Sequence, residues 1–177
     1  MSFEISFQQV VMIEGGYSDH PSDTGGKTMY GITEQVARDN GYTGAMKDLP
    51  LETAKAIYKA QYWDINRLDD VDAISKEIAH EMFDTGVNMG VGYAVKFLQR
   101  SLNVLNRIGR DYRDISTDGV MGPSTLSALR AYINKRGHTI LLKALNVLQG
   151  ARYIDLAERR EKNEDFVNGW LDHRIEL

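Results

Sequence analysis

Apolar residues recur along most of this sequence at the three- and four-residue spacing that places them on one face of an α-helix. The first such stripe consists of Phe3, Phe7, Val10 and Val11, at i, i+4, i+7 and i+8. A clear strand-like alternation of apolar and polar residues is hard to find. The spacing therefore predicts a mainly α-helical protein.

Capping and turn residues divide the first half into successive helices. Residues 15–33 predict a long loop, or a loop with a short hairpin. Thr33 is placed to cap a helix that runs to about Asn40. Pro50 precedes a further helix that ends near Trp63. Asp72 is the expected cap of the next helix, one face of which holds Ile74, Ile78, Met82 and Thr85.

The second half repeats this pattern after a cluster of glycines at 86–92. An apolar helix is expected from Ala94 to Leu105, followed by a polar stretch that breaks the pattern. Pro123 suits the first turn of a helix to about Lys135. A longer helix follows His138, and a short terminal helix includes Phe166 and Trp170.

The glycine cluster is the best candidate for a domain boundary. The chain has 177 residues, 42% of them hydrophobic, which suits one medium domain or two small ones that share a core. We expect a catalytic domain over residues 1–89 and a helical domain over residues 90–177, packed against it.

Composition limits the compartment and the partners. A net charge of −4 without a basic stripe argues against nucleic acid, and no apolar run is long enough for stable membrane insertion. The absence of cysteine excludes disulfides and thiol catalysis. The first residues lack the basic region of a signal peptide. We expect synthesis in the cytoplasm without a signal peptide.

The stretch MIEGGYSD places a glutamate where its charge is hard to keep. Glu14 follows Phe3 by eleven residues and projects into the middle of the apolar sector of the first helix. Desolvation there raises the pKa of a carboxyl group, and the negative end of the helix dipole acts in the same direction. Such a carboxylic acid can protonate a leaving oxygen. The alternative is a solvated glutamate at a helix end.

The loop after Glu14 supplies further polar groups. Glycoside hydrolysis commonly uses two carboxyl groups, one acidic and one ionised. Asp23 lies in a polar loop, where it should stay charged, and Asp19 lies nearby. Tyr17 and Tyr30 offer ring faces for sugars. The alternative for either aspartate is a turn in which the carboxylate bonds its own backbone.

Competing motifs fail on their spacing. GGKT lacks the preceding glycine and strand of a phosphate-binding loop. HEMFD begins like a zinc-protease helix, but Asp84 occupies the position of the second histidine. No serine lies in a nucleophile elbow. The sequence thus predicts neither a metal nor another cofactor.

The segments EGGY and HPSDTGGKTMYGIT, at 14–17 and 20–33, resemble the signature of the glycoside hydrolase family 108 muramidases. The resemblance continues through residues 84–103. These enzymes are phage endolysins and secretion-associated lysozymes with a lysozyme-like α fold. The glutamate of EGGY is the catalytic acid of that family, so the resemblance implies this role for Glu14.

A second resemblance concerns the wider phage-type lysozymes, whose sites follow a Glu, eight residues, Asp, five residues, Thr pattern. Eight residues separate Glu14 from Asp23, but only four separate Asp23 from Thr28. The resemblance implies Asp23 as the second carboxylate and Thr28 as a residue that holds water. Thr33 and Tyr30 are substitutes for Thr28.

Asp84 and Asn88 lie at i and i+4, and so share one helix face beside the apolar stripe. We expect them to bind hydroxyl or N-acetyl groups of the glycan. The alternative is a helix-terminal cap beside a glycine-rich turn.

Residues 118–129, DGVMGPSTLSAL, resemble a segment of peptidoglycan-binding modules. Together with FLQRSLN, this segment implies a C-terminal peptidoglycan-binding domain. Asp118-Gly119 and Gly122-Pro123 also suit a plain turn and helix start.

These observations predict a monomeric muramidase that cleaves the glycan strand of peptidoglycan between N-acetylmuramic acid and N-acetylglucosamine. The expected role is that of a phage or prophage endolysin, released to the periplasm through a holin or another non-classical route. An enzyme that opens the wall for toxin export fits equally. The alternatives from other classes are a non-catalytic wall-binding protein and an amidase or peptidase of the peptide stem.

Overall fold

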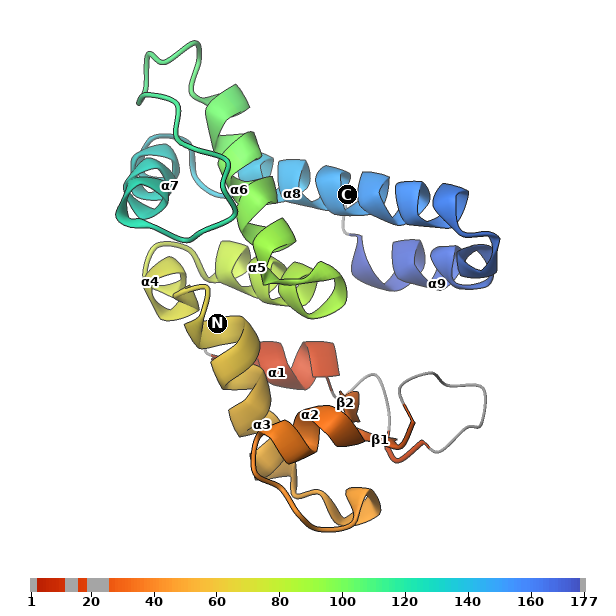
Figure 1. The fold of residues 1–177 in the computed structure, drawn as a ribbon. Helices are drawn as coiled ribbons and strands as arrows, with labels where there is room; N and C mark the ends of the chain where they lie inside the picture. The colour runs from red at the N-terminus through yellow and green to blue at the C-terminus, as the bar shows by residue number, and fades with distance from the viewer. Residues whose placement is uncertain (1–2, 12–15, 19–25, 176–177) are drawn as a thin grey trace.

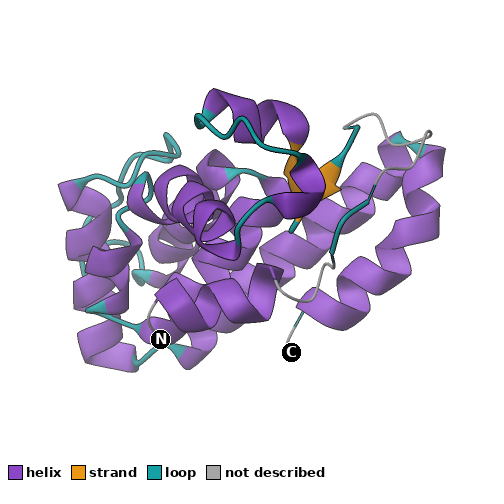
Figure 2. Cartoon of the chain, turned by 90° about the horizontal axis from the view of Figure 1, so that it is seen from below, coloured by secondary structure: helices purple, strands orange, loops and turns teal. Residues whose placement is uncertain are grey.

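A computed structural model describes residues 3–11, 16–18 and 26–175 of the chain. Helices account for most of these residues, and one two-stranded hairpin is the only sheet among them (Figure 2). The mainly α-helical fold that the apolar spacing predicts is confirmed. In Figure 1 the elements of residues 3–11 and 28–64 lie toward the bottom, the helices of residues 68–89 and 164–174 lie across the middle, and those of residues 91–159 extend to the top.

The first helix, α1 (Phe3–Val11), buries the predicted stripe. Phe7, Val10 and Val11 are almost fully buried. Phe3 contacts the rings of Trp63 and Phe83 edge to face, with centroids 5.5 and 5.8 Å apart. This geometry is favourable for aromatic rings, and it fixes α1 against α5.

The next elements form the lower part of the first half in Figure 1. Thr33 caps α2 as predicted, since its Oγ1 accepts a hydrogen bond from the amide of Val36 at 3.3 Å. The helix predicted after Pro50 is also present, and its last turns widen into a π-helix. The elements are β1 (Thr28–Met29), β2 (Ile32–Thr33), α2 (Glu34–Asp39), the 3₁₀ turn η2 (Met46–Asp48), α3 (Leu51–Tyr58) and the π-helix η3 (Lys59–Asp64).

The expectation that Asp72 caps the following helix is wrong. A short helix, α4 (Leu68–Asp72), occupies this part of the chain. The cap of α5 (Lys76–Met89) is Ser75, whose Oγ accepts a hydrogen bond from the amide of Ile78 at 3.4 Å. Asp72 and Ser75 are both good caps in isolation, and the buried Leu68 and Val71 of α4 decide between them.

A sharp turn at Gly90 joins α5 to α6 (Val91–Leu105). Gly90 has a φ of 98°, which only glycine adopts readily. The other two glycines of the cluster, Gly86 and Gly92, lie inside helices. The predicted boundary after residue 89 falls at this turn.

The rest of the chain is helical after a loop over residues 106–122. Pro123 opens α7 in its first turn, as predicted. The long helix after His138 and the terminal helix are also present. The elements are α7 (Pro123–Arg136), α8 (Thr139–Arg159), the 3₁₀ turn η4 (Glu161–Asn163) and α9 (Glu164–Arg174).

One buried apolar cluster extends through both halves of the chain, from Phe7 in α1 to Leu145 in α8. The central helices α5 and α6 contribute fully buried residues to it, among them Phe83 and Leu98. The second half therefore packs directly against the helix that carries Asp84. Among the described residues, no helix is both long and apolar enough to cross a membrane.

Candidate active site

The hairpin that carries Thr28 and Tyr30 has a two-residue turn. Tyr30 and Gly31 have φ values of 52° and 74°, the combination of a type I′ turn, which matches the twist of the flanking strands. The hydroxyl of Tyr58 donates a hydrogen bond to the carbonyl oxygen of Tyr30 at 3.1 Å. These contacts fix the turn against α3.

A third stretch of backbone lies beside this hairpin. The amide of Ser18 donates to the carbonyl of Thr28 at 3.0 Å, and the amide of Thr28 donates back to Ser18 at 2.9 Å. This pairing brings Tyr17, 44% exposed, to the same region as Thr28 and Tyr30. The structure thus unites three of the predicted site residues.

The predicted carboxyl groups of the loop, Glu14, Asp19 and Asp23, lie outside the described residues. The structure describes the residues that flank the segment from Glu14 to Asp23. Val11 ends α1 in the core, and Gly26 precedes the hairpin. The roles of the three carboxyl groups stay predictions.

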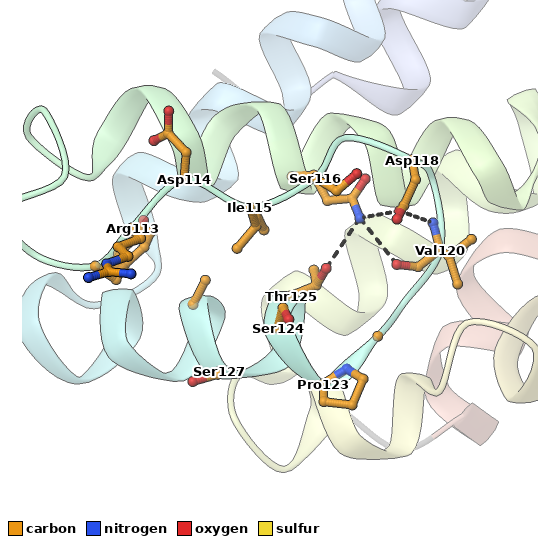
Figure 3. Close-up of a pocket in the computed structure, with 14 residues that line it drawn as sticks. Arg113, Asp114, Ile115, Ser116, Asp118, Val120, Pro123, Ser124, Thr125 and Ser127 are labelled. Carbon is orange, nitrogen blue, oxygen red and sulfur yellow. Dashed lines mark hydrogen bonds between the residues drawn. The ribbon is translucent and has the colours of Figure 1, made fainter.

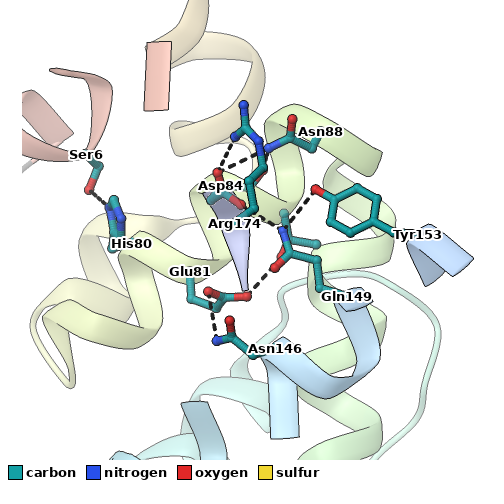
Figure 4. A network of polar contacts seen from close by, with 10 residues as sticks. Ser6, His80, Glu81, Asp84, Asn88, Asn146, Gln149, Tyr153 and Arg174 are labelled. Atoms are coloured by element: carbon teal, nitrogen blue, oxygen red, sulfur yellow. Dashed lines mark hydrogen bonds and ion pairs between the residues drawn. The ribbon is translucent and has the colours of Figure 1, made fainter. Parts of the chain in front are cut away.

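Two buried carboxylates on α5 face the second half of the chain (Figure 4). One oxygen of Glu81 accepts a hydrogen bond from Asn146 Nδ2 at 3.2 Å, and the other accepts from Thr85 at 3.4 Å. Asp84 pairs with Arg174, at 2.6 Å between Nη1 and Oδ1. Its second oxygen accepts a hydrogen bond from Gln149 at 2.7 Å.

Asp84 and Asn88 share one face of α5, as predicted. The amide nitrogen of Asn88 donates to the backbone carbonyl of Asp84 at 2.8 Å and to its carboxylate at 3.2 Å. The carboxylate is thus held by two side chains from α8 and α9, Gln149 and Arg174. Asn88 itself is exposed. Binding of sugar by this pair stays a prediction.

Local patterns in the sequence do not predict the roles of Asn146, Gln149 and Arg174. Asn146 and Gln149 follow their carboxylate partners by 65 residues, and Arg174 follows Asp84 by 90 residues. No local spacing links residues so far apart. The one available signal was that Asn146 and Gln149 interrupt the apolar face of α8.

Burial also raises the pKa of Tyr153, whose phenol lies next to this network. Tyr153 is 3% exposed, and its hydroxyl accepts a hydrogen bond from Gln149 at 3.4 Å. Burial, more than the nearby charge of Asp84, raises the pKa of Tyr153 well above its usual value. The phenol therefore stays neutral at any physiological pH.

Polar contacts also join α1 to α5. Nδ1 of His80 lies 3.1 Å from the hydroxyl of Ser6, which is fully buried.

Among the described residues, no group of three or more His, Asp or Glu side chains is arranged to hold a metal ion.

Comparison with known families assigns both halves of the chain. Residues 7–90 match the family model described as glycosyl hydrolase 108, and residues 93–175 match the model described as a predicted peptidoglycan domain. The first half of the chain is thus similar to glycoside hydrolase family 108, and the second half to peptidoglycan domains. The fold is similar to that of SagA from Brucella abortus, with a TM-score of 0.64 and 25% identity, over 96% of this chain and 95% of that one. No curated protein sequence matches the chain.

The family 108 assignment confirms the resemblance carried by EGGY and the segment that follows it. The protein is a lysozyme-like glycoside hydrolase, and peptidoglycan is its substrate. The match over residues 7–90 contains the hairpin, Asp84 and Asn88, as well as the segment that holds Glu14.

Proposed function

We propose that this family 108 hydrolase is an N-acetylmuramidase, which cleaves the β-1,4 bond between N-acetylmuramic acid and N-acetylglucosamine. Glu14 protonates the glycosidic oxygen, and Asp23 stabilises or activates the second step. The observation that carries the proposal is the match of residues 7–90 to a glycosyl hydrolase family. That range includes the EGGY segment.

The buried face of α1 supports Glu14 as the acid. Phe7 and Val10 precede Glu14 by seven and four residues, the spacing of one helix face, and they are 1% and 4% exposed. The apolar sector in which the sequence predicts Glu14 is therefore a buried one. A carboxyl group beside such a surface holds its proton to higher pH.

The hairpin supports a sugar groove on the same half. Tyr17, which is 44% exposed, lies next to Ser18, the backbone partner of Thr28. The type I′ turn holds the backbone of Tyr30, whose side chain is partly buried. Aromatic faces and hydroxyl groups suit the apolar and polar sides of a sugar ring. In this proposal Asp19 and the exposed Asn88 complete the groove, and the buried Asp84 holds the amide of Asn88 in place.

The decisive experiment digests purified Gram-negative sacculi with the wild-type protein and with Glu14→Gln. The amide keeps the shape of the carboxylic acid but cannot donate its proton. We expect the wild type to release muropeptides with reducing N-acetylmuramic acid ends, and the variant to lose activity by about 10²-fold or more. Glu52→Gln is the matched control, because that side chain is 80% exposed on α3.

Equal activity of Glu14→Gln and wild type would refute Glu14 as the acid. The products separate the other classes. New amino groups without new reducing ends would identify an amidase or peptidase, and binding to sacculi without any product would identify a wall-binding protein.

We propose further that the protein is a monomeric phage or prophage endolysin, made in the cytoplasm and active in the periplasm, where its substrate lies. Expression in a Gram-negative host should then lyse the cells only when a holin is expressed with it. Lysis by the protein alone would contradict holin-dependent release, and wall opening without lysis would favour the toxin-export role.

A further inference from the structure

Three amide side chains, two on α6 and one at its C-cap, hold the irregular loop over residues 106–122. Gln99, Asn103 and Asn106 lie at i, i+4 and i+7, so they share a face. Gln99 and Asn106 are each 1% exposed. Buried amides cost free energy unless every polar atom finds a partner, and here the partners lie in the loop.

The side-chain amide of Gln99 joins the loop to α7. Its Nε2 lies 2.9 Å from Asp118 Oδ1, 3.1 Å from the carbonyl of Val120 and 3.2 Å from Thr125 Oγ1. Its Oε1 accepts a hydrogen bond from the amide of Gly119 at 2.9 Å. Asp118, Gly119 and Thr125 of the DGVMGPST segment are therefore structural residues that fix this turn.

The other two amides fix the earlier part of the loop. Asn103 donates to the carbonyl of Ile115 at 2.8 Å and accepts from its amide at 2.9 Å. Asn106 donates to Asp114 at 2.5 Å and accepts from the amide of Gly109 at 2.9 Å. These hydrogen bonds hold the loop in place although it has no regular secondary structure, and a preorganised loop lowers the ordering cost of binding a ligand.

The loop and α7 line an open hollow of about 680 Å³. This volume is in the range of small-molecule sites. Its lining combines apolar surface with hydroxyl groups (Figure 3). Ile115 and Pro123 supply apolar surface, and Ser116, Ser124 and Ser127 supply hydroxyls.

The charges at the hollow favour a neutral ligand. Among the described residues of its lining, Arg113 is the one cation, and its charge is offset by Asp114 and Asp118. Both carboxylates accept hydrogen bonds from amide side chains, Asp114 from Asn106 at the end of α6 and Asp118 from Gln99. The carboxylate-rich peptide stems of peptidoglycan would find no excess of positive charge here. Neutral sugars, which present apolar ring faces together with hydroxyl and acetamido groups, match the lining.

We propose that this hollow binds an N-acetylated amino sugar of the peptidoglycan glycan strand, at a site formed by the second half of the chain alone. The identity of the ligand rests on the proposed function, since a muramidase acts on this glycan strand. A second binding site for the same strand raises the effective concentration of glycan at the catalytic half.

The test titrates the full-length ¹⁵N-labelled protein with the disaccharide of N-acetylglucosamine and N-acetylmuramic acid, into the millimolar range. A muramidase leaves this disaccharide intact, so the wild-type protein can be used. We expect chemical shift changes at the amides of Ser116, Ser124 and Ser127. Ser127→Tyr places a bulky ring in the hollow and should weaken these changes by about tenfold or more.

Asn134→Tyr is the matched control, since Asn134 is exposed on the same helix outside the lining. It should bind like the wild type. Absence of shift changes at the hollow, or equal binding by Ser127→Tyr and wild type, would overturn the proposal.

The release of reducing ends from sacculi reports the proposed function separately. Hydrolysis without binding at the hollow would refute only the second site. Binding at the hollow without hydrolysis would refute only the muramidase assignment.

Discussion

Gly31 is the residue that the hairpin turn can least replace. Its φ of 74° strains any residue with a Cβ, and a Cβ there would lie 2.7 Å from the hydroxyl of Tyr58. We expect Gly31→Ala to lower the free energy of unfolding by about 1–3 kcal/mol, as measured by urea denaturation.

Gly169→Ala is the control for this prediction. Gly169 lies inside α9 with open space around the position of a Cβ, and alanine is favoured there by about 1 kcal/mol. The two substitutions should therefore change stability in opposite directions. A gain of stability in Gly31→Ala would contradict the strained turn.

The two loop aspartates make a second test at the scale of single residues. If Asp23 is the second carboxylate, Asp23→Asn should reduce kcat on sacculi by about 10²-fold or more. Asp19→Asn, in the predicted groove, should act mainly on KM. Steady-state kinetics on solubilised glycan distinguish the two, and the reverse pattern would exchange their roles.

At the scale of elements, the start of α5 depends on Ser75. Its hydroxyl accepts from the amide of Ile78 and donates to the carboxylate of Glu77 at 2.8 Å. Ser75→Ala should lower the free energy of unfolding by about 1 kcal/mol, whereas Ser75→Thr, which keeps the hydroxyl, should lose less. Equal losses in thermal denaturation would show that the cap does not matter.

The loop over residues 106–122 should make stability depend on pH in the acidic range. A hydrogen bond from Lys135, with a second from Arg136, lowers the pKa of Asp111. Hydrogen bonds from Gln99 and the amide of Val120 lower that of Asp118. A carboxyl group whose pKa is lower in the folded state stabilises the fold above its unfolded value of about 3.9.

That stabilisation is lost as the pH falls from about 3.9 through the folded pKa values. We expect the Tm to decrease over this window, and Asp118→Asn to flatten part of the decrease. A Tm of Asp118→Asn that follows pH as steeply as the wild type would exclude Asp118 as a source.

Across the whole molecule, the ion pair between Arg174 and Asp84 joins α9 to α5 of the catalytic half. Each side chain is 12% exposed. Removal of one partner leaves a largely buried charge, so Arg174→Ala should destabilise the protein by about 3–5 kcal/mol. Arg159→Ala is the control, because Arg159 is 69% exposed in its pair with Asp155 and should cost about 0–1 kcal/mol.

A double-mutant cycle completes this test. If the pair is the cause, Asp84→Ala combined with Arg174→Ala should lose less stability than the sum of the two single changes. Additive losses would mean that each side chain acts through other neighbours.

The helices and the resemblance to family 108 follow from the sequence alone, because both depend on the local order of residues. Apolar spacing and capping residues act over three or four positions, so Thr33 and Pro123 could be placed correctly. The same local rules left Asp72 and Ser75 as rival caps, and only the packing of α4 decided between them.

Which distant side chains meet depends on the packing of the helices in the folded chain. Glu81 and Asp84 find partners 65 and 90 residues away, and Gln99 reaches across to α7. These contacts depend on how α5, α6, α8 and α9 pack on one shared core. Helical spacing shows which face a residue occupies, but the face of the partner helix that covers it is set by the packing of the whole chain.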